Sequence, residues 1–473
     1  MEKLTKIVAT ISDRKCDADF ICALYEEGMD VVRINTAHQN PDQTMKIIEN
    51  VRSVSIRIPF MVDTKGPEVR TNASEEDVIV LKDQMIRVEG HNSKASTKDC
   101  IYVNYPDFVK HMEPDKQIMI DDGDIALSVV EKHASHLICR VENNGTIQGR
   151  KSVNLPGTVI TLPSLNAKDI EYIHFAIKNK LDFIAHSFVR NKEDLLAIQE
   201  ILDEHDNPVK LIAKIENQQG VDNIDEILDH CYGIMIARGD LAIEVPAERI
   251  PGIQASLIKK CIRRKKAVII ATQMLHSMIQ NPRPTRAEVS DIANAVFNGT
   301  DAVMLSGETA FGKYPLESLK MMTRTVREAE RSRSFNIDSN VLPHDNYISV
   351  FLSKTAVRTI SKLNTKAIIT DTDTGKTARY LSAFRGRIPI YAQCYEERVM
   401  RELALNYGVF ADQMDVETSK KTFIKTTLSG LIGQGEINEG DLIVVLAGNF
   451  GKKAGPSFVE ISTARNMLQE GTV

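Results

Sequence analysis

The sequence predicts an α/β protein: a (β/α)8 TIM barrel with an inserted small all-β lid domain and a C-terminal α/β domain. Three observations lead to this prediction. Eight apolar runs of strand length end in polar or charged residues, helical patterns fill most of the gaps, and one stretch of short alternating runs interrupts the order. The length of 473 residues is too great for one hydrophobic core, so two to four domains are expected.

The eight predicted barrel strands share an apolar run followed by a polar end. They are KIVATI (6–11), VVRINTA (31–37), PFMVDTK (59–65), FIAHSFV (183–189), LIAKIE (211–216), GIMIARGD (233–240), AVIIATQM (267–274) and AVMLSGET (302–309). In a parallel barrel the carboxyl ends of the strands meet at one mouth, which is where the active site is built.

Eight predicted helices lie between these strands, each with apolar residues at helical spacing. The seventh begins with the capping-box spacing of Thr285 and Glu288 and ends at Gly299. In chain order the helices are 18–27, 44–54, 168–179, 193–205, 222–229, 251–265, 286–298 and 315–331.

The predicted domains are the barrel over 1–69 and 163–342, a β-barrel lid over 70–162 and an α/β domain over 343–473. The lid segment contains short alternating runs such as DVIVL, MIRVEG and HLICRVENNG, separated by turn signals. An insertion after the third strand, at the catalytic face of a barrel, is well placed to close over a substrate.

The C-terminal domain is expected to contain strands at 366–371, 388–393, 409–414, 442–448 and 458–462, with helices between them. Its segment TDTDTGKTAR (370–379) lies between a strand and a helix. Lys376, Arg379 and the helix start favour a phosphate group, whereas Asp371 and Asp373 oppose one. An effector site for a sugar phosphate or nucleotide and an ordinary strand–helix turn both remain open.

Composition excludes several classes of function. The net charge of −5 gives no reason to expect nucleic acid or an anionic membrane as a partner, and no apolar run is long enough to span a bilayer. The first residues are interpreted as a strand rather than as a signal peptide. Seven scattered cysteines without a C-x-x-C pair are expected to be reduced thiols of a cytoplasmic protein.

Polar side chains gather at the ends of the predicted barrel strands. A single one of them is more often a strand-end cap than a catalyst, but each buried charge in so large a set needs a partner. The set comprises Arg33, Asn35, Asp63, Thr64, Lys65, Ser187, Arg190, Lys214, Glu216, Arg238, Asp240, Thr272, Ser306 and Glu308.

The chemistry of this set indicates a Mg²⁺ enzyme that acts on a small anion. Arg33 and Lys214 can counter phosphoryl oxygens, and Glu216 and Asp240 can hold Mg²⁺ with room for substrate oxygens. Thr272 is equally well explained as a buried hydroxyl bonded to the backbone or as part of a proton relay. The spacing of His38 and His186 indicates only structural or supporting roles.

Seven motifs, in order and at matching spacing, resemble the pyruvate kinase family. They are DTKGPEVR (63–70), VNLPG (153–157), KIEN (214–217), IARGDLAIEVP (236–246), ATQML (271–275), PRPTRAE (282–288) and MLSGETA (304–310). The resemblance implies transfer of the phosphoryl group of phosphoenolpyruvate to ADP, protonation of the enolate to pyruvate, release of ATP and a homotetrameric assembly.

The resemblance also implies roles for individual residues. Lys214 and Arg33 would contact the phosphoryl group, while Thr272 with water, and also Ser306 and Glu308, would serve the proton path. By the same resemblance, Glu216 and Asp240 would bind Mg²⁺ or Mn²⁺, and the backbone N–H groups of Ala237, Arg238 and Gly239 would bind the substrate carboxylate. The nucleotide would be bound by Asn35, His38, Arg70 and Lys151, and it would bring a second Mg²⁺.

Departures from the family concern affinity more than the reaction. Ala37 replaces a serine that helps to bind K⁺, while Asn35, Asp63 and Thr64 of that site and the accompanying Glu68 are present. K⁺ activation with weak K⁺ affinity is therefore expected. The loop SDRKC (12–16), His186 and Ala242 also differ from the usual family residues.

Two other functions were weighed against this one. A Mg²⁺-dependent lyase or aldolase that uses the same substrate would not need a nucleotide-closing lid with Arg70 and Lys151. A degenerate homologue that only senses a metabolite would be favoured by loss of Lys214, Glu216 or Asp240, and all three are present.

Overall fold

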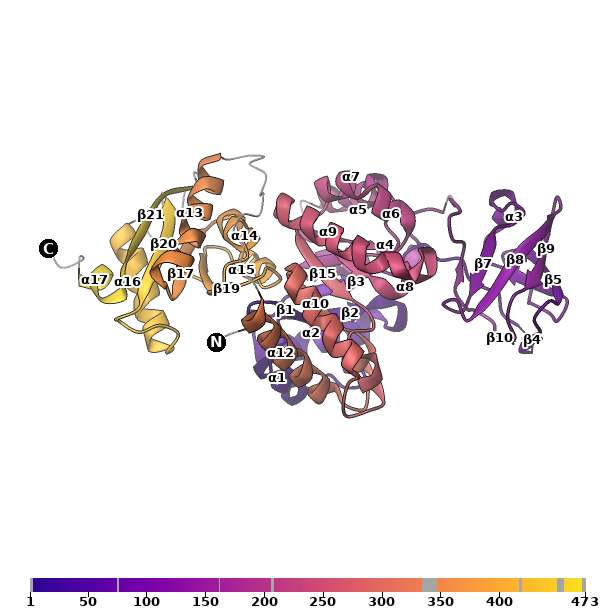
Figure 1. Cartoon of the computed structure of the whole chain (residues 1–473), viewed down its shortest axis with the longest axis horizontal. Coiled ribbons are helices and arrows are strands. Elements are labelled where there is room, and N and C mark those ends of the chain that lie inside the picture. Colours follow the sequence, from indigo (N-terminus) through magenta and orange to yellow (C-terminus); the bar gives the residue numbers. More distant parts are fainter. Residues whose placement is uncertain are drawn as a thin grey trace.

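The computed structural model describes residues 3–74, 76–160, 162–205, 208–333, 347–416, 419–448 and 455–469. Figure 1 shows the barrel in the middle, with the lid strands at one end and the C-terminal sheet at the other. The predicted boundary at 342/343 and most of the polar stretch 331–346 lie outside the described residues. The boundaries at 69/70 and 162/163 stay predictions.

Eight parallel strands close into the predicted barrel, in the order β1-β16-β15-β14-β13-β12-β3-β2. They are β1 (Lys6–Thr10), β2 (Val31–Asn35), β3 (Phe60–Asp63), β12 (Phe183–His186), β13 (Lys210–Ile215), β14 (Gly233–Ala237), β15 (Ala267–Ala271) and β16 (Ala302–Leu305). All eight predicted strands are confirmed, but most of their polar tails lie in the loops that follow. Those loops form the barrel mouth.

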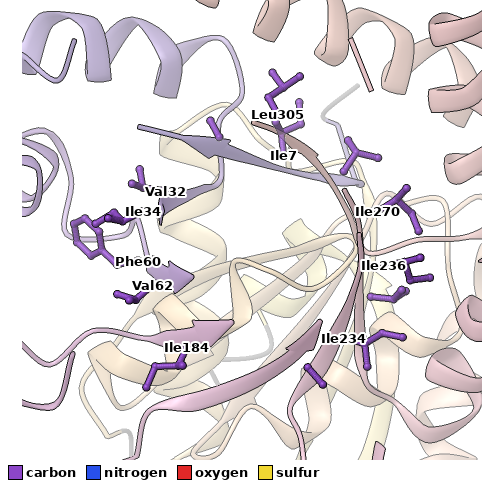
Figure 2. Packing of buried hydrophobic residues seen from close by; sticks show 14 of the residues in the cluster. Ile7, Val32, Ile34, Phe60, Val62, Ile184, Ile234, Ile236, Ile270 and Leu305 are labelled. Carbon is purple, nitrogen blue, oxygen red and sulfur yellow. The ribbon is translucent and has the colours of Figure 1, made fainter. Parts of the chain in front are cut away.

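The two-residue period of the strands decides which side chains face the barrel interior. Ile34, Val62 and Ile184 point outward against the surrounding helices, together with other aliphatic residues of the same cluster (Figure 2). A separate inner cluster, which includes Met61, Phe183 and Met235, fills the barrel itself. Residues one position away from the outward ones therefore point toward the interior at the mouth.

All eight predicted helices are confirmed to within a few residues. Seven of them are α1 (Ala18–Glu26), α2 (Pro41–Val54), α4 (Ala167–Lys178), α5 (Lys192–Glu204), α9 (Ile250–Arg264), α10 (Arg286–Asn298) and α12 (Pro315–Ser332). The capping box of α10 is present, with Thr285 accepting from the Glu288 N–H and Glu288 accepting from the Thr285 N–H. Gly299 ends that helix in the left-handed conformation, at φ +86°.

The predicted helix over 222–229 is confirmed to within two residues by α7 (Ile224–Asp229), and a short helix that was not predicted, α6 (Gln218–Asp222), precedes it. The two helices meet at Asn223. Asn217 starts α6 early because its side chain accepts from the Gly220 N–H at 2.7 Å. The Asn223 side-chain amide donates to the Arg190 carbonyl at 2.9 Å. It therefore does not cap the N-terminus of α7. Short helices α8 (Arg238–Glu244) and α11 (Gly307–Ala310) also follow β14 and β16.

The lid has its own apolar core and two sheets, one of six strands in the order β11-β7-β8-β9-β5-β6 and one of two strands, β10-β4. One four-residue helix, α3 (Phe108–His111), departs from the all-β prediction. The strands are β4 (Val78–Val80), β5 (Met85–Gly90), β6 (Cys100–Val103), β7 (Gln117–Ile120), β8 (Ile125–Lys132), β9 (Leu137–Val141), β10 (Gly145–Ile147) and β11 (Val153–Asn154).

The C-terminal domain contains all five predicted strands in one sheet of order β19-β18-β17-β20-β21, in which only β21 is antiparallel. The strands are β17 (Ala367–Thr372), β18 (Ile390–Cys394), β19 (Val409–Gln413), β20 (Leu442–Gly448) and β21 (Pro456–Thr463). The helices are α13 (Tyr347–Leu363), α14 (Lys376–Ala383), α15 (Glu397–Leu403), α16 (Lys420–Gly433) and α17 (Ala464–Gln469).

Two further sequence predictions concern the cysteines and the membrane. All seven cysteines are free thiols. Within the described ranges, no helix has the length and apolar character that a membrane crossing requires.

A buried ion pair joins the barrel to the C-terminal domain. The Arg385 guanidinium donates to the Asp301 carboxylate at 2.6 Å, and the two side chains are 6% and 2% exposed. Asp301 also accepts from the backbone N–H groups of Val268 and Tyr407, at 3.1 and 3.0 Å. Both domains therefore share the same carboxylate.

Replacing Asp301 with Ala should lower the free energy of unfolding by about 3–5 kcal/mol, because it leaves the Arg385 charge buried without a partner. Urea denaturation followed by circular dichroism would measure the change. The control is Asp412→Ala, because the Arg57–Asp412 pair also joins the two domains but its side chains are 48% and 39% exposed. Loss of an exposed pair should cost at most about 1 kcal/mol. Equal costs in the two variants would contradict the prediction.

Candidate active site

The Lys214 ammonium lies at the centre of the barrel mouth and donates to three acceptors. The Lys214 Nζ is 3.0 Å from Asp63 Oδ1, 3.0 Å from Glu216 Oε1 and 2.6 Å from Ser187 Oγ. Burial alone would lower the pKa of Lys214, but the attraction of Asp63 and Glu216 outweighs burial and raises it above the ordinary value. The lysine therefore carries a full positive charge at neutral pH.

Arg33 forms the second cationic group of the mouth. Its guanidinium donates to Asp63 Oδ2 at 2.7 Å and to the Thr10 hydroxyl at 3.0 Å. Burial would raise the pKa of Asp63, but Arg33 and Lys214 together hold it below the ordinary value. Asp63 thus stays ionised and links the two cations, in agreement with the predicted grouping of these residues.

Glu216 and Asp240, together with Asp63, carry more carboxylate groups than the two cations can balance. Burial raises the pKa of Glu216 to about 7 against the attraction of Lys214, and repulsion by Asp240 adds to the rise. Burial likewise raises the pKa of Asp240. Among the residues that the structure describes here, three carboxylates, those of Asp63, Glu216 and Asp240, lie with the two cations Arg33 and Lys214. A hard divalent cation fits such a donor set, because it would relieve the repulsion between the two carboxylates.

The predicted K⁺ ligands lie beside this cluster. Asn35 and Asp63 are cross-strand partners on β2 and β3, and Thr64 follows Asp63. Asn35 Oδ1 accepts from the Ala37 N–H at 3.1 Å, and the Thr64 carbonyl accepts from the Ser187 hydroxyl at 2.7 Å. The oxygens suit a hard monovalent cation, and Ala37 contributes no hydroxyl.

Thr272 occupies a strained backbone position at the end of β15. Its backbone φ is +68° and that of Gln273 is +55°, values that residues other than glycine rarely adopt. The Thr272 hydroxyl donates to the Ala271 carbonyl and accepts from the Gly239 N–H, each at 2.7 Å. Sequence analysis left two interpretations open, and the hydroxyl is indeed bonded to backbone while its residue lines the cavity described below.

Glu308 joins the loops that follow β15 and β16. Its carboxylate is 2% exposed and accepts from the Leu275 N–H at 3.0 Å and the Ser306 N–H at 2.8 Å. Ser306 lies beside it at the cavity wall. The contacts of Glu308 are those of a clamp between loops, and its predicted part in a proton path stays a prediction.

The backbone of residues 237–239 starts helix α8, as predicted, but the Arg238 side chain turns away. Its guanidinium donates to Asp291 and to the carbonyl oxygens of Ala271 and Thr272. Arg238 therefore fixes the strained segment at Thr272, whereas the Gly239 N–H faces the Thr272 hydroxyl. The Arg238 side chain is therefore engaged elsewhere, and the Gly239 N–H already has an acceptor in Thr272.

Two neighbouring cavities share Asn35, His38, Asp122 and Asp240. The first has a volume of about 820 Å³ and also touches Arg33, Gly239, Thr272, Ser306 and Glu308. The second has a volume of about 580 Å³ and extends to the lid residues Glu68, Arg70 and Lys151. Four of the predicted substrate residues, Arg33, Gly239, Asp240 and Thr272, and all four predicted nucleotide residues therefore line adjoining cavities, whereas Lys214, Ala237 and Arg238 are not among the residues that line these two.

The lid cations are held by carboxylates in this arrangement. Arg70 Nε is 2.7 Å from Glu68 Oε2, and Lys151 Nζ is 2.8 Å from Asp121 Oδ2. Such partly exposed pairs are weak, so a nucleotide phosphate can compete for the cations.

Sequence analysis missed two residues of this site. Asp122 lines both cavities, and the run DDGD (121–124) between β7 and β8 was the signal that could have identified it. Ser187 was named as a strand-end residue without a role, although its hydroxyl contacts Lys214. Far from the mouth, Thr374 and Arg379 of segment 370–379 line a cavity of about 480 Å³ with barrel residues that include Lys210.

A parallel barrel with a buried lysine, two carboxylates suited to a divalent cation and a cationic lid defines the class of barrel phosphotransferases. The family model of the pyruvate kinase barrel domain matches residues 2–319, and that of the pyruvate kinase alpha/beta domain matches residues 351–461. The chain therefore belongs to the pyruvate kinase family.

Relatives match over nearly the whole chain. It is 45% identical to the pyruvate kinase of Borreliella burgdorferi, with 99% of each protein covered, and 39% identical to that of Geobacillus stearothermophilus, covering 100% of this chain and 82% of the relative. A crystal structure of a pyruvate kinase from Cryptosporidium parvum superimposes with a TM-score of 0.93 at 33% identity, covering 98% of this chain and 96% of the other.

Replacing Glu308 with Gln should reduce the free energy of unfolding by about 1–3 kcal/mol, because an amide N–H₂ replaces one acceptor of a buried backbone N–H group. Thermal unfolding would detect the change, with the exposed Glu317→Gln on α12 as a matched control. A fully stable Glu308→Gln variant that loses only enolate protonation would contradict the clamp and favour the relay.

Proposed function

We propose that Lys214, Arg33, Glu216 and Asp240 form the centre at which the phosphoryl group leaves phosphoenolpyruvate for ADP. As a member of the pyruvate kinase family, the chain is a phosphotransferase that forms pyruvate and ATP in the last step of glycolysis. The observation that carries the residue assignment is the buried Lys214 ammonium, which lies within 3.0 Å of the carboxylates of Asp63 and Glu216 and of the Ser187 hydroxyl.

Lys214 acts through its charge. During transfer, negative charge spreads over the equatorial oxygens of the phosphoryl group, and a preorganised cation in a buried site stabilises that charge strongly. The raised pKa of Lys214 keeps it protonated throughout. Arg33, held by Asp63 and Thr10, adds a second fixed cation with a planar fork suited to phosphoryl oxygens.

The family requires a divalent cation and K⁺. In this chain Glu216 and Asp240 would hold Mg²⁺ or Mn²⁺, and Asn35, Asp63 and Thr64 would hold K⁺. When bound, the divalent cation supplies Lewis-acid neutralisation of the substrate oxygens. Glu216 is already oriented for such a role, because one of its oxygens accepts from the Phe188 N–H at 2.7 Å and cannot swing freely.

Thr272 is proposed to stand on the proton path to the enolate carbon. Its hydroxyl is fixed by the Gly239 N–H and by the strained backbone, and it lies on the wall of the same cavity as Ser306. The proton would pass through water next to this hydroxyl. The N–H groups of residues 237–239 would orient the substrate carboxylate at the start of α8.

Arg70 and Lys151 are proposed to bind the nucleotide phosphates from the lid, with Asn35 and His38 on the barrel side of the same cavity. Exchange of their present partners, Glu68 and Asp121, for phosphate oxygens would draw the lid toward the barrel and exclude water. This lid contribution is the observation that favours a kinase over a lyase. We also propose a homotetramer in the cytoplasm, as the family resemblance implies.

Replacing Lys214 with Met should lower ATP formation from phosphoenolpyruvate and ADP by about a hundred- to a thousandfold, because the transferring group loses a buried cation. Proton exchange at the methyl group of pyruvate should be largely spared, because that half-reaction builds no charge on a phosphoryl group. Coupled ATP assays and deuterium exchange by NMR measure the two half-reactions. Lys210→Met, at the opposite end of β13, is the matched control and should leave both unchanged. Equal loss of the two half-reactions would contradict the role.

Replacing Ala37 with Ser should reduce the K⁺ concentration needed for half-maximal activation severalfold, because it adds an oxygen donor next to Asn35. Activity should be titrated with KCl at constant ionic strength, using tetramethylammonium chloride as the balancing salt and saturating Mg²⁺. The unsubstituted protein should be activated by K⁺ with weaker affinity. An unaltered K⁺ requirement in the variant would remove residue 37 from the cation site.

A further inference from the structure

We propose that Ser187 is a positioning residue for Lys214, and that it is supported from behind by Thr64 and His186. Ser187, Thr64 and His186 form a hydrogen-bonded row at the junction of β3 and β12, and the three residues are 2%, 2% and 1% exposed. The inference rests on the proposed role of Lys214 in phosphoryl transfer.

The first link joins Lys214 to Ser187. The Lys214 Nζ donates to Ser187 Oγ at 2.6 Å, and the Ser187 hydroxyl donates in turn to the Thr64 carbonyl at 2.7 Å. Because the serine proton is directed at a backbone carbonyl, its lone pairs point toward the ammonium. Ser187 is thereby a fixed acceptor that is anchored to the main chain of the neighbouring strand.

Ser187 differs chemically from the other two acceptors of Lys214. Asp63 and Glu216 are carboxylates, which orient the ammonium but also offset its charge. Glu216 is in addition a proposed ligand of the divalent cation, and Asp63 is shared with Arg33. Ser187 is neutral, so it directs Lys214 without reducing the charge that Lys214 can offer to a phosphoryl group.

The second link runs from Ser187 to His186 through the Thr64 side chain. The Ser187 N–H donates to Thr64 Oγ1 at 3.2 Å, and Thr64 Oγ1 is 3.0 Å from His186 Nδ1. Burial lowers the pKa of His186 to about 4, so the ring is neutral at pH 7. With its proton on Nδ1, His186 donates to Thr64 and leaves only a lone pair without a partner at Nε2, which is buried.

Close packing against the backbone of Gly66 also confines Ser187. Gly66 lies against Ser187 at φ +70°, and a Cβ atom there would come within 2.8 Å of Ser187 Cβ and 2.9 Å of its carbonyl oxygen. The N–H groups of Lys65 and Gly66 donate to the Asp169 carboxylate of α4, at distances from 2.9 to 3.4 Å, which fixes this loop. Ser187 is therefore held by hydrogen bonds on one side and by backbone packing on the other.

Ser187→Ala and Ser187→Cys test the proposal. Both should lower kcat for ATP formation about tenfold, because Lys214 loses a hydrogen bond made by a charged group. The KM for phosphoenolpyruvate should change less than about twofold, because the charge that Lys214 stabilises develops during phosphoryl transfer, and methyl-proton exchange of pyruvate should be spared, because it builds no charge on a phosphoryl group. The Cys variant keeps a side chain of the same shape and slightly larger volume but accepts hydrogen bonds poorly, so it remains informative if the Ala variant is unstable.

His186 supplies a second, weaker perturbation. His186→Ala should lower kcat by about threefold, and His186→Asn should restore it, because an amide can donate to Thr64 from near the position of Nδ1. Ser353→Ala is the matched control: among the described residues, the hydroxyl of this buried serine of α13 has no hydrogen-bond partner, and the residue lies outside the site. It should leave every kinetic constant unchanged.

Several results would overturn the proposal. Wild-type kcat in Ser187→Ala, or full recovery in Ser187→Cys, would show that Ser187 only fills space. Equal loss of both half-reactions would show general damage rather than positioning. Wild-type kcat in His186→Ala would show that His186 does not contribute to the positioning of Ser187. Lys214→Met in the same assays separates the two claims: if it retains phosphoryl transfer, the role of Lys214 fails, and if it loses transfer while both Ser187 variants do not, only the present inference fails.

Discussion

The ion cluster around Lys214 is the interaction on which the rest of the site depends. A buried ammonium is tolerated only with acceptors on every N–H group, and Asp63, Glu216 and Ser187 provide them. Asp63 in turn binds Arg33 and so fixes the second cation. The cluster as a whole is rich in carboxylates, which immobilise the two cations and form a donor set that a divalent cation would fit.

The barrel makes the cluster possible because it brings distant parts of the chain into register. Asn35 lies beside Asp63, and Ala185, one residue before His186, lies beside Asp63 on its other side. The outward aliphatic residues anchor each strand to its helix, and the inward position next to each of them is then fixed in space at the mouth (Figure 2). Close packing of this outer core keeps the charged side chains within hydrogen-bond distance of one another.

Two consecutive residues at the barrel mouth depart from ordinary backbone conformation. Thr272 and Gln273 adopt positive φ. The Arg238 guanidinium donates hydrogen bonds to the carbonyl oxygens of Ala271 and Thr272 in this segment. Glu308 ties two mouth loops together from inside the barrel wall. Strain of this kind persists only where the surroundings impose it, and here it accompanies the hydrogen bond from the Gly239 N–H to the Thr272 hydroxyl at the wall of one cavity.

The sequence by itself determined the barrel, the lid and the C-terminal sheet, because apolar periodicity and turn residues are local signals. It also determined the family and the cluster of Arg33, Lys214, Glu216 and Asp240, because charged residues at the ends of parallel strands must meet at one mouth. It did not determine the short helix α6, which begins where the Asn217 side chain accepts from the Gly220 N–H. Only the tertiary structure decided that Ser187 contacts Lys214, that Arg238 turns away and that Asp122 joins the site, because these depend on side-chain directions and on loops that no periodicity encodes.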